Sequence, residues 1–303
     1  MREQTQNQTK NFFLGNMLAL TATVIWAGNF IAAKILANAY SGLEMSYWRW
    51  LIAMIFAFPF AMKHMKQDIP YIFKEWKLML FYGGIGCFFS NLLLYNAPHT
   101  APAVDMTILM ATSPLLMMFL SWIFFKEKIN PFWIMGSIIA LIGVCVLVTK
   151  GNLKIFQEVN FTVGHFWTLG CSFFFALYSI SLRLFKEKIN IWVFLETTFF
   201  IAFIANFSSC LIFNQALPVI HSLKDLGAVL YIGIFSSLVA YICWNKAIEL
   251  IGAVRTGIIY YLVPVFGSFF AVILINETIG IFQLIGGTMV LGGVLICTCF
   301  KNH

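Results

Sequence analysis

The two halves of the chain repeat one pattern of residues. Five residues of the first half recur with unchanged spacing in the second half: Ala103, Pro114, Glu127, Gly136 and Gly143 match Ala253, Pro264, Glu277, Gly286 and Gly293. Nearer the start of each half the register shifts by one residue, and Gly15, Lys34, Tyr82 and Asn96 match Gly164, Arg183, Tyr231 and Asn245. Each half is therefore a copy of one unit. If that unit crosses a membrane an odd number of times, the second copy is inverted relative to the first.

The composition indicates that a lipid bilayer, not water, surrounds most of the chain. Of the 303 residues, 61% are hydrophobic and only 10% are charged, which is too little charge to cover a soluble protein of this length. The formal net charge of +7 comes from basic residues in short breaks between apolar runs. Because these residues form no patch interleaved with aromatic side chains, we expect no nucleic-acid partner.

Ten apolar segments are long enough to cross the hydrocarbon core of a bilayer, which needs about 20 residues of helix. They cover approximately 14–36, 43–62, 78–97, 102–124, 132–149, 164–185, 191–213, 226–247, 252–275 and 279–300. Five segments fall in each half, so the inversion follows. The sequence predicts an all-α integral membrane protein with ten transmembrane helices, built as two inverted five-helix repeats over residues 14–149 and 164–300.

The distribution of Lys and Arg tests this inversion independently, because equivalent loops of inverted copies face opposite compartments. Lys126 and Lys128 flank Glu127 in the first half, whereas Asn276 and Thr278 flank Glu277 in the second. Over all the breaks, one side of the membrane collects about thirteen basic residues and the other about three. The positive-inside rule therefore predicts that both termini are cytoplasmic.

Polar side chains within the membrane are costly, so those away from helix ends are the candidate functional residues. Trp26, Asn29 and Lys34 share one side of the first helix, and Tyr178 and Arg183 occupy the equivalent segment of the second half. The remaining candidates are Asn91, Tyr95, Asn96, Tyr241, Trp244, Asn245 and Tyr261. A cavity lined by aromatic rings and a few amides suits a small amphipathic metabolite. The alternative is that these groups only pack and form hydrogen bonds between helices.

The charged candidates allow several roles. Lys34 and Arg183 are equivalent in the repeat and should lie near opposite sides of the membrane, where each would bind a carboxylate or phosphate, contribute to a gate, or extend to the interface. Arg49 and Glu196 lie in the second helix of each half, and the sequence does not establish a pair between them. The roles of Glu127 and Glu277 also stay open.

Pro114 and Pro264 fall in the middle of predicted transmembrane helices. A proline there removes a backbone hydrogen bond and produces a kink or hinge. One hinge in each half is the device that alternating access by rocking of the halves would use.

No motif for catalysis or cofactor binding accompanies these features. The chain has no H-E-x-x-H, G-x-S-x-G or phosphate-binding loop, and its seven cysteines and five histidines show no metal-ligand spacing. We therefore expect no enzyme activity, no cofactor and no metal. The first apolar run lacks a convincing cleavage site, which favours a retained helix over a removed signal peptide.

The segment Trp26, Ala27, Gly28, Asn29, Phe30, followed by Lys34 and Arg49, together with the doubled A-x10-P-x12-E-x8-G-x6-G pattern, resembles the EamA branch of the drug/metabolite transporter superfamily. The resemblance covers residues 14 to 300, and it is weaker in the second copy, which has Phe175, Ala176 and Tyr178. It implies ten transmembrane helices, a central cavity formed mainly by helices one, three, four, six, eight and nine, cytoplasmic termini, and movement of amino acids or related small metabolites, often outward.

The expected function is that of a secondary transporter, an exporter of small metabolites working by alternating access. The alternative within transport is a carrier of nucleotide-linked or lipid-linked sugars, which should have more cationic residues in its cavity than Lys34 and Arg183. A non-transporting receptor or scaffold is the alternative from another class. The expected partners are a small-molecule substrate and the lipid bilayer; a coupling proton or ion and the oligomeric state are left open. Fifteen Lys against four Arg suggest an AT-rich bacterial genome and hence a bacterial inner membrane.

Overall fold

The computed structural model describes residues 2–36, 39–101, 103–152, 154, 161–184, 189–213, 218–275 and 280–299; within these ranges the side chains of 2–8, 30, 34, 35, 103, 104, 271, 274 and 275 are not described. The first half contains α1 (Arg2–Leu36), α2 (Gly42–Lys74), α3 (Trp76–Leu80), η1 (Phe81–Phe89), α4 (Ser90–Asn96), η2 (Ala97–His99), α5 (Ala103–Met110), α6 (Ser113–Phe125) and α7 (Pro131–Thr149). The second half contains α8 (Val163–Ser181), η4 (Leu182–Leu184), α9 (Ile191–Ile212), α10 (Leu223–Leu230), η5 (Tyr231–Val239), α11 (Ala240–Ile251), α12 (Ala253–Tyr260), α13 (Val263–Ile275) and α14 (Ile281–Cys299).

These elements combine into ten helical spans that are long and apolar enough to cross a membrane, counted over the described ranges. The predicted fold class is confirmed: the chain is an all-α membrane protein with ten spans. The second span differs from the prediction, because α2 continues to Lys74 through residues that we expected to form a break. Its last turns carry Lys63, Lys66 and exposed polar neighbours, so the sequence loses its apolar character there while the helix continues.

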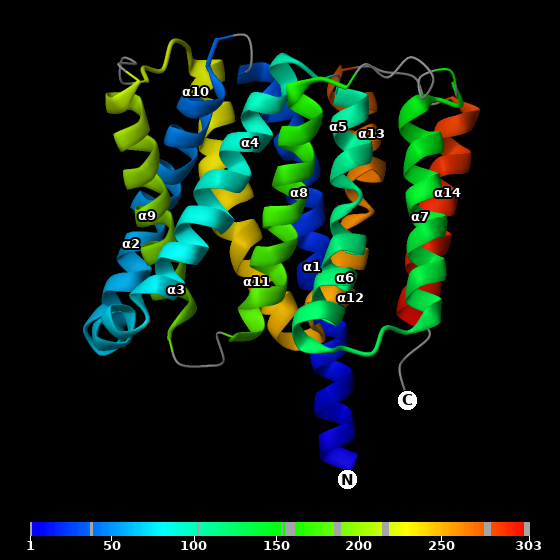
Figure 1. The fold of residues 1–303 in the computed structure, drawn as a ribbon, viewed down its shortest axis with the longest axis horizontal. Helices are drawn as coiled ribbons and strands as arrows, with labels where there is room; N and C mark the ends of the chain where they lie inside the picture. Colours follow the sequence, from blue (N-terminus) through cyan, green and yellow to red (C-terminus); the bar gives the residue numbers. More distant parts are fainter. Residues whose placement is uncertain are drawn as a thin grey trace.

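The two halves are inverted relative to each other. Figure 1 shows that α1 begins and α14 ends at the same end of the bundle. The connection from α6 to α7 also lies at that end, whereas α13 ends and α14 begins at the opposite end. Equivalent connections of the two halves thus lie at opposite ends of the bundle, as the charge asymmetry predicts. We call the end where α1 begins the N-terminal end of the bundle.

The glycines of the doubled pattern bring the last helix of each half into contact. α7 and α14 lie side by side (Figure 1), and a Cβ atom at Gly143 would be 2.8 Å from the backbone oxygen of Gly286. A Cβ atom at Gly293 would be 2.4 Å from the backbone oxygen of Gly136. Such small residues allow membrane helices to approach closely. The recurrence of these glycines in both halves follows from the fact that each copy contributes one helix to the same contact.

The two repeated prolines mark interruptions of the helices. Residues 111–112 separate α5 from α6, and residues 261–262 separate α12 from α13, so Pro114 and Pro264 each occupy the first turn of the second piece. Proline is tolerated there because the N–H groups of the first turn of a helix have no acceptor within that helix. A residue without an N–H therefore loses no hydrogen bond at this position. The sequence predicted a kink or hinge at both sites. The breaks are present, and their use as hinges stays a prediction.

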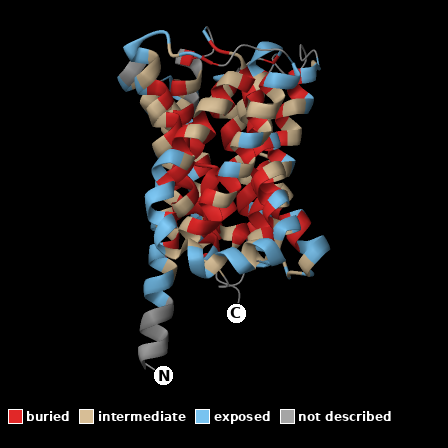
Figure 2. Cartoon of the chain, turned by 90° about the vertical axis from the view of Figure 1, so that its left-hand side faces the viewer, coloured by how far each residue is buried: buried red, intermediate tan, exposed pale blue. Residues whose placement is uncertain are grey.

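Two π-helical segments, η1 and η5, occupy corresponding places in the two halves. No feature of the sequence pattern predicts them. In this conformation some backbone carbonyls lack their usual helical partner and can accept hydrogen bonds from neighbouring helices. Figure 2 shows buried residues gathered inside the bundle and exposed ones along its outside. Large apolar side chains such as Trp122 and Leu295 are exposed, which is the surface that lipid tails cover.

Candidate functional site

A small cavity lies between the two halves. Its volume is about 50 Å³, enough for a few water molecules. Seven of its lining residues come from the first half: Trp26, Asn29, Arg49, Ser90, Asn91, Leu94 and Met110. The other four come from the second half: Cys171, Phe175, Tyr241 and Tyr260. The first half therefore supplies the charge and the amides, and the second half supplies mainly rings.

Arg49 is the charged residue of this lining. Its side chain is 2% exposed and comes from α2. One terminal nitrogen donates to the Tyr95 hydroxyl at 2.7 Å, and the other donates to the backbone oxygen of Ser236 at 3.0 Å. The guanidinium carbon lies 5.1 Å from the centre of the Trp50 ring. Among the described residues, Arg49 forms no ion pair with an acidic group, so Glu196 is not its partner.

The Ser236 oxygen belongs to η5, and it joins the halves at the cavity. It accepts from Arg49 and also from the indole nitrogen of Trp26, at 2.9 Å. Both donors come from the first half, whereas η5 belongs to the second. In an α-helix the Ala240 N–H would donate to this carbonyl, but here it donates to the Phe235 and Ser237 oxygens. The helix conformation that the sequence analysis missed thus positions two residues of the lining.

Amides and hydroxyls form a polar layer beside Arg49. The Asn91 side-chain nitrogen donates to the Cys87 backbone oxygen at 2.9 Å and lies 3.4 Å from the Tyr241 hydroxyl. The Tyr95 hydroxyl donates to the Asn29 side-chain oxygen at 3.4 Å. These groups are buried and come from α1, α4 and α11. The layer places neutral hydrogen-bonding groups around the guanidinium.

Aromatic rings form another part of the lining. The Trp26 ring centre is 5.4 Å from that of Phe175, 5.9 Å from that of Tyr260 and 5.0 Å from that of Trp244. The Trp244 indole nitrogen donates to the Ser179 hydroxyl at 3.1 Å, which fixes its ring behind the lining. The cavity lining therefore combines one cation and several polar groups with a cluster of aromatic rings.

Repeat-equivalent tyrosines connect the halves on either side of the site. The Tyr82 hydroxyl donates to the Ser181 backbone oxygen at 2.6 Å, and the Tyr231 hydroxyl donates to the Ile25 backbone oxygen at 2.8 Å. Each bond runs from the π-helical segment of one half to the first helix of the other. The repeated tyrosines therefore have an architectural role, which explains why they are equivalent in the repeat.

The structure brings most of the predicted site residues together. Trp26, Asn29, Asn91 and Tyr241 line the cavity. Tyr95, Tyr178, Trp244 and Asn245 contact these residues or lie directly behind them; the Tyr178 hydroxyl, for example, donates to the Asn245 side-chain oxygen at 3.0 Å.

The other four predicted residues are not found in this group. Asn96 donates to the Leu92 backbone oxygen of its own helix at 2.8 Å. Tyr261 packs in a separate buried cluster with Trp133 and Met118. Arg183 lies at the N-terminal end of the bundle, and the Lys34 side chain lies outside the described residues.

The sequence analysis missed several lining residues. Phe175 and Tyr260 were not selected because aromatic residues are abundant along the whole chain. Met110, Cys171 and Leu94 are apolar and carry no signal of function. Arg49 was noted only in its helix and in the resemblance, although a lone arginine in an apolar span indicates a functional site by itself.

Two polar pairs join the halves, one at each end of the bundle: one links α5 to α8, and the other links the α6–α7 connection to η4. At the N-terminal end, Arg183 pairs with Glu127 at 2.9 Å, with side chains 33% and 27% exposed. The guanidinium carbon also lies 5.1 Å from the centre of the Phe125 ring. This contact gives Glu127 a partner, a role that the sequence left open. Glu277 lies outside the described residues.

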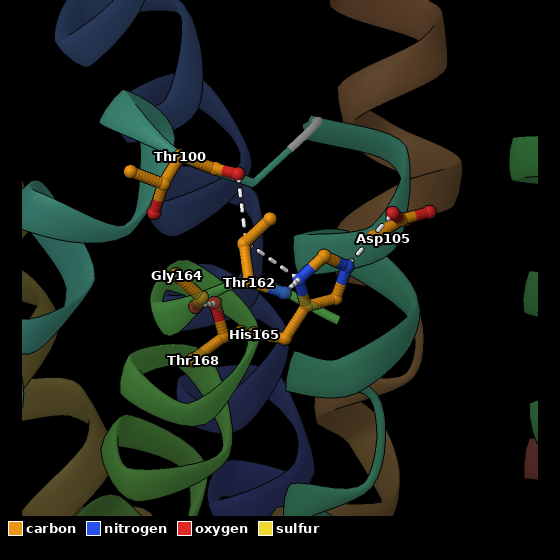
Figure 3. Close-up of polar contacts among 6 residues, drawn as sticks. All are labelled: Thr100, Asp105, Thr162, Gly164, His165 and Thr168. Atoms are coloured by element: carbon orange, nitrogen blue, oxygen red, sulfur yellow. Dashed lines mark hydrogen bonds and ion pairs between the residues drawn. The ribbon is translucent and has the colours of Figure 1, made fainter. Parts of the chain in front are cut away.

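At the opposite end, His165 contacts Asp105 at 2.9 Å (Figure 3). The other ring nitrogen of His165 accepts from the Thr162 backbone N–H at 3.1 Å, and the Thr162 hydroxyl donates to the Thr100 backbone oxygen at 2.7 Å. Because one nitrogen accepts, the neutral ring carries its proton on the nitrogen that faces Asp105. The start of α8 is thus attached both to α5 and to Thr100, which directly follows η2.

No metal site is visible in the part of the chain that the structure describes, since it contains no group of three potential ligands. Among the described residues, no acid, histidine or lysine reaches the cavity lining given above. The arrangement is one that can hold a small molecule by charge, hydrogen bonds and ring contacts.

Comparisons with known proteins agree with this description. A sequence profile described as the EamA-like transporter family matches the chain twice, at residues 13–149 and 162–299. An Archaeoglobus fulgidus protein described as an uncharacterized transporter is 28% identical, with 95% of this chain and 97% of the relative covered. An Escherichia coli protein described as a "probable amino-acid metabolite efflux pump" is 24% identical, with 92% and 93% covered.

A solved crystal structure shares the fold, with a TM-score of 0.76 at 17% identity, covering 94% of this chain and 96% of that one. The doubled family match spans both halves of the structure, including every residue that lines the cavity. The ten membrane spans and the inverted halves fit the architecture of such proteins. The chain belongs to the EamA-like transporter family.

Proposed function

We propose that this membrane transporter is a secondary exporter of small metabolites, such as amino acids or related compounds, and that it works by alternating access. The observation that carries the proposal is the cavity itself. It is lined by both halves and presents a buried cation, two amides and several rings to a bound molecule. A site of this kind between inverted repeats is where secondary transporters bind their substrates.

The size of the cavity supports alternating access. A volume of about 50 Å³ holds a few waters but not a whole amino acid, so helices must separate before a metabolite can enter. The interruptions at Pro114 and Pro264 lie on helices that reach the cavity, through Met110 and Tyr260. The pairs Glu127–Arg183 and Asp105–His165 hold the two halves together at opposite ends. We propose that opening at either end separates such contacts while the prolines allow the helix pieces to reorient.

The substrate class and the direction rest on chemistry and on one relative. The E. coli relative is named as an efflux pump for amino-acid metabolites, and the cavity of this chain offers groups that suit a small amphipathic solute. A nucleotide-linked or lipid-linked sugar is a poorer match, because its phosphates call for several cations and the described lining holds one, Arg49. A receptor or scaffold role would not require a cavity lined by charged, polar and aromatic residues between two pseudo-symmetric halves.

We further propose a bacterial inner-membrane location with both termini in the cytoplasm. The basic residues support this orientation. Lys63, Lys66, Lys126 and Lys128 lie on α2 or in the α6–α7 connection, at or towards the N-terminal end of the bundle. Basic residues are retained on the cytoplasmic side during insertion.

Export can be tested with purified protein in proteoliposomes loaded with a mixture of radiolabelled amino acids. We expect efflux of a subset of them to exceed that of empty vesicles. Trp26→Ala removes a lining ring and should reduce this efflux by at least tenfold. Trp122→Ala is the matched control, because Trp122 is 56% exposed on the outer surface, and it should leave efflux unchanged. If no solute moves faster than in empty vesicles under any imposed ion gradient, the proposal is wrong.

A further inference from the structure

We infer that Arg49 is the substrate-binding residue that holds a carboxylate, and that this cavity therefore selects carboxylates with an apolar body, whether or not they carry an amino group. This inference rests on the proposed function, because it takes the cavity to be the substrate site. It goes further by naming the group that every substrate must have.

The first support is the position of the cation. Arg49 is 98% buried and lines the cavity. An ionised side chain within a membrane protein is costly unless an opposite charge lies close to it. Among the described residues no acidic side chain pairs with Arg49, and its partners Tyr95 and Ser236 provide neutral oxygens. The positive charge of Arg49 is therefore not balanced until an anion enters the cavity.

The second support is the set of hydrogen-bond donors that Arg49 leaves unused. A guanidinium has five N–H groups. Two of them donate to Tyr95 and Ser236, and the buried Nε has no hydrogen-bond partner. The two bonds fix the plane of the guanidinium. A carboxylate can accept two parallel bonds from such a planar fork, which is the geometry that arginine favours.

The neutral groups around Arg49 fit the same ligand. Asn29, Ser90 and Asn91 line the cavity beside the guanidinium and can orient an anion without adding charge. A volume of about 50 Å³ is enough for a carboxylate group, which is the size of a few waters. The present structure thus has room for the head group before the helices separate to admit the rest of the molecule.

The remaining lining defines the rest of the substrate. Trp26, Phe175 and Tyr260 present rings, and Leu94 and Met110 add apolar surface. Among the described residues no carboxylate reaches the cavity to pair with an ammonium group. An amino group on the substrate is therefore tolerated and not required, whereas loss of the carboxylate leaves the Arg49 charge unpaired.

The test is equilibrium binding to the full-length protein in detergent micelles, measured by calorimetry. The probes are four carboxylates (propionate, 3-methylbutanoate, 3-phenylpropionate and indole-3-propionate), the matching amino acids, and the matching amines that lack the carboxylate. We expect at least one carboxylate and its amino acid to bind with affinities within tenfold of each other. The matching amine should bind at least 30-fold more weakly. An amine that binds as well as its carboxylate, or a protein that binds none of the carboxylates, overturns the inference.

Variants connect this preference to Arg49. Arg49→Gln should weaken carboxylate binding at least 30-fold, and Arg49→Lys should weaken it less, because the charge remains while the fork is lost. The matched control is Arg255→Gln: Arg255 lies on α12 outside the cavity lining, with its guanidinium over the Phe12 and Trp133 rings. It should bind carboxylates as the wild type does. Gel-filtration profiles show whether each variant is folded, and the comparison of probes on the wild type does not depend on any variant. Unchanged carboxylate binding by folded Arg49→Gln overturns the inference.

The outcomes also separate this inference from the proposed function. Carboxylate binding that depends on Arg49, without transport in proteoliposomes, would leave the inference standing and refute the transport proposal. Transport of amino acids that amines inhibit as strongly as carboxylates do would refute the inference and leave the transport proposal standing.

Discussion

Two adjacent glycines of α14 allow a test of how closely this helix packs against α7 of the other half. A Cβ atom at Gly293 would lie 2.4 Å from the Gly136 backbone oxygen and 2.7 Å from the Ala140 backbone nitrogen. At Gly292 the same atom would meet nothing within 4 Å. Gly293→Ala therefore tests the contact, and Gly292→Ala is its control on the same helix.

The expected magnitude follows from these distances. Real Cβ atoms essentially never approach a neighbour within 3.0 Å, so α7 and α14 must separate by roughly half an ångström or more, and overpacking of this kind costs about 1–3 kcal/mol. Replacing glycine by alanine in a helix also gains up to about 1 kcal/mol from the lower conformational freedom of alanine. That gain is common to both variants. Their difference in unfolding free energy, about 1–3 kcal/mol, therefore isolates the steric conflict.

The measurement is unfolding of the purified variants by SDS titration in mixed micelles, followed by circular dichroism. Gly293→Ala should unfold at a lower SDS fraction than Gly292→Ala. Gly292→Ala should match or slightly exceed the wild type. Equal stability of the two variants would show that α7 and α14 do not meet through their glycines, and the explanation of the doubled G-x6-G pattern would fail with it.

Two further predictions concern orientation and the wall of the site. In a variant without its native cysteines, single cysteines at Lys126 and Gly280 should react with a membrane-impermeant maleimide from opposite sides of the membrane; reaction from the same side contradicts the inversion. Trp244→Phe keeps a ring but removes the hydrogen bond to Ser179, so it should lower the unfolding free energy by about 0.5–1.5 kcal/mol, seen as a lower SDS midpoint. Trp122→Phe on the outer surface is its control, and an equal effect of both changes would exclude a role for the buried bond.

The fold could be predicted because it follows from the spacing of apolar, charged and repeated residues along the chain. The doubled pattern gave two copies, the apolar runs gave five spans in each, and odd spans with asymmetric charge gave the inversion. Helical spacing also placed Trp26 and Asn29 on one side of α1, and both line the cavity. These inferences need only helix geometry and the cost of burying charge.

The rest of the site depends on how the helices of the two halves face one another, which spacing within one helix does not determine. Phe175 and Tyr260 line the cavity, but 33 Phe and 10 Tyr are spread over the chain, and most such rings meet lipid or other helices. The π-helical geometry of η5, which makes the Ser236 oxygen available to Arg49 and Trp26, has no signature in the apolar pattern. It shifts the helical phase locally and changes which residues face the interior.

Residues that recur in both halves of the chain have different roles from residues that occur in one half only. Residues that recur in both halves build the scaffold: Tyr82 and Tyr231 make equivalent bonds between halves, and the glycines of α7 and α14 meet each other. Polar residues of the cavity lining are not repeated in the second half: Arg49 corresponds in register to Thr198, and Asn91 corresponds to Ala240. In this chain the residues that recur make contacts between the halves, and the residues that do not recur include Arg49 and Asn91, on which the proposed recognition of a carboxylate depends.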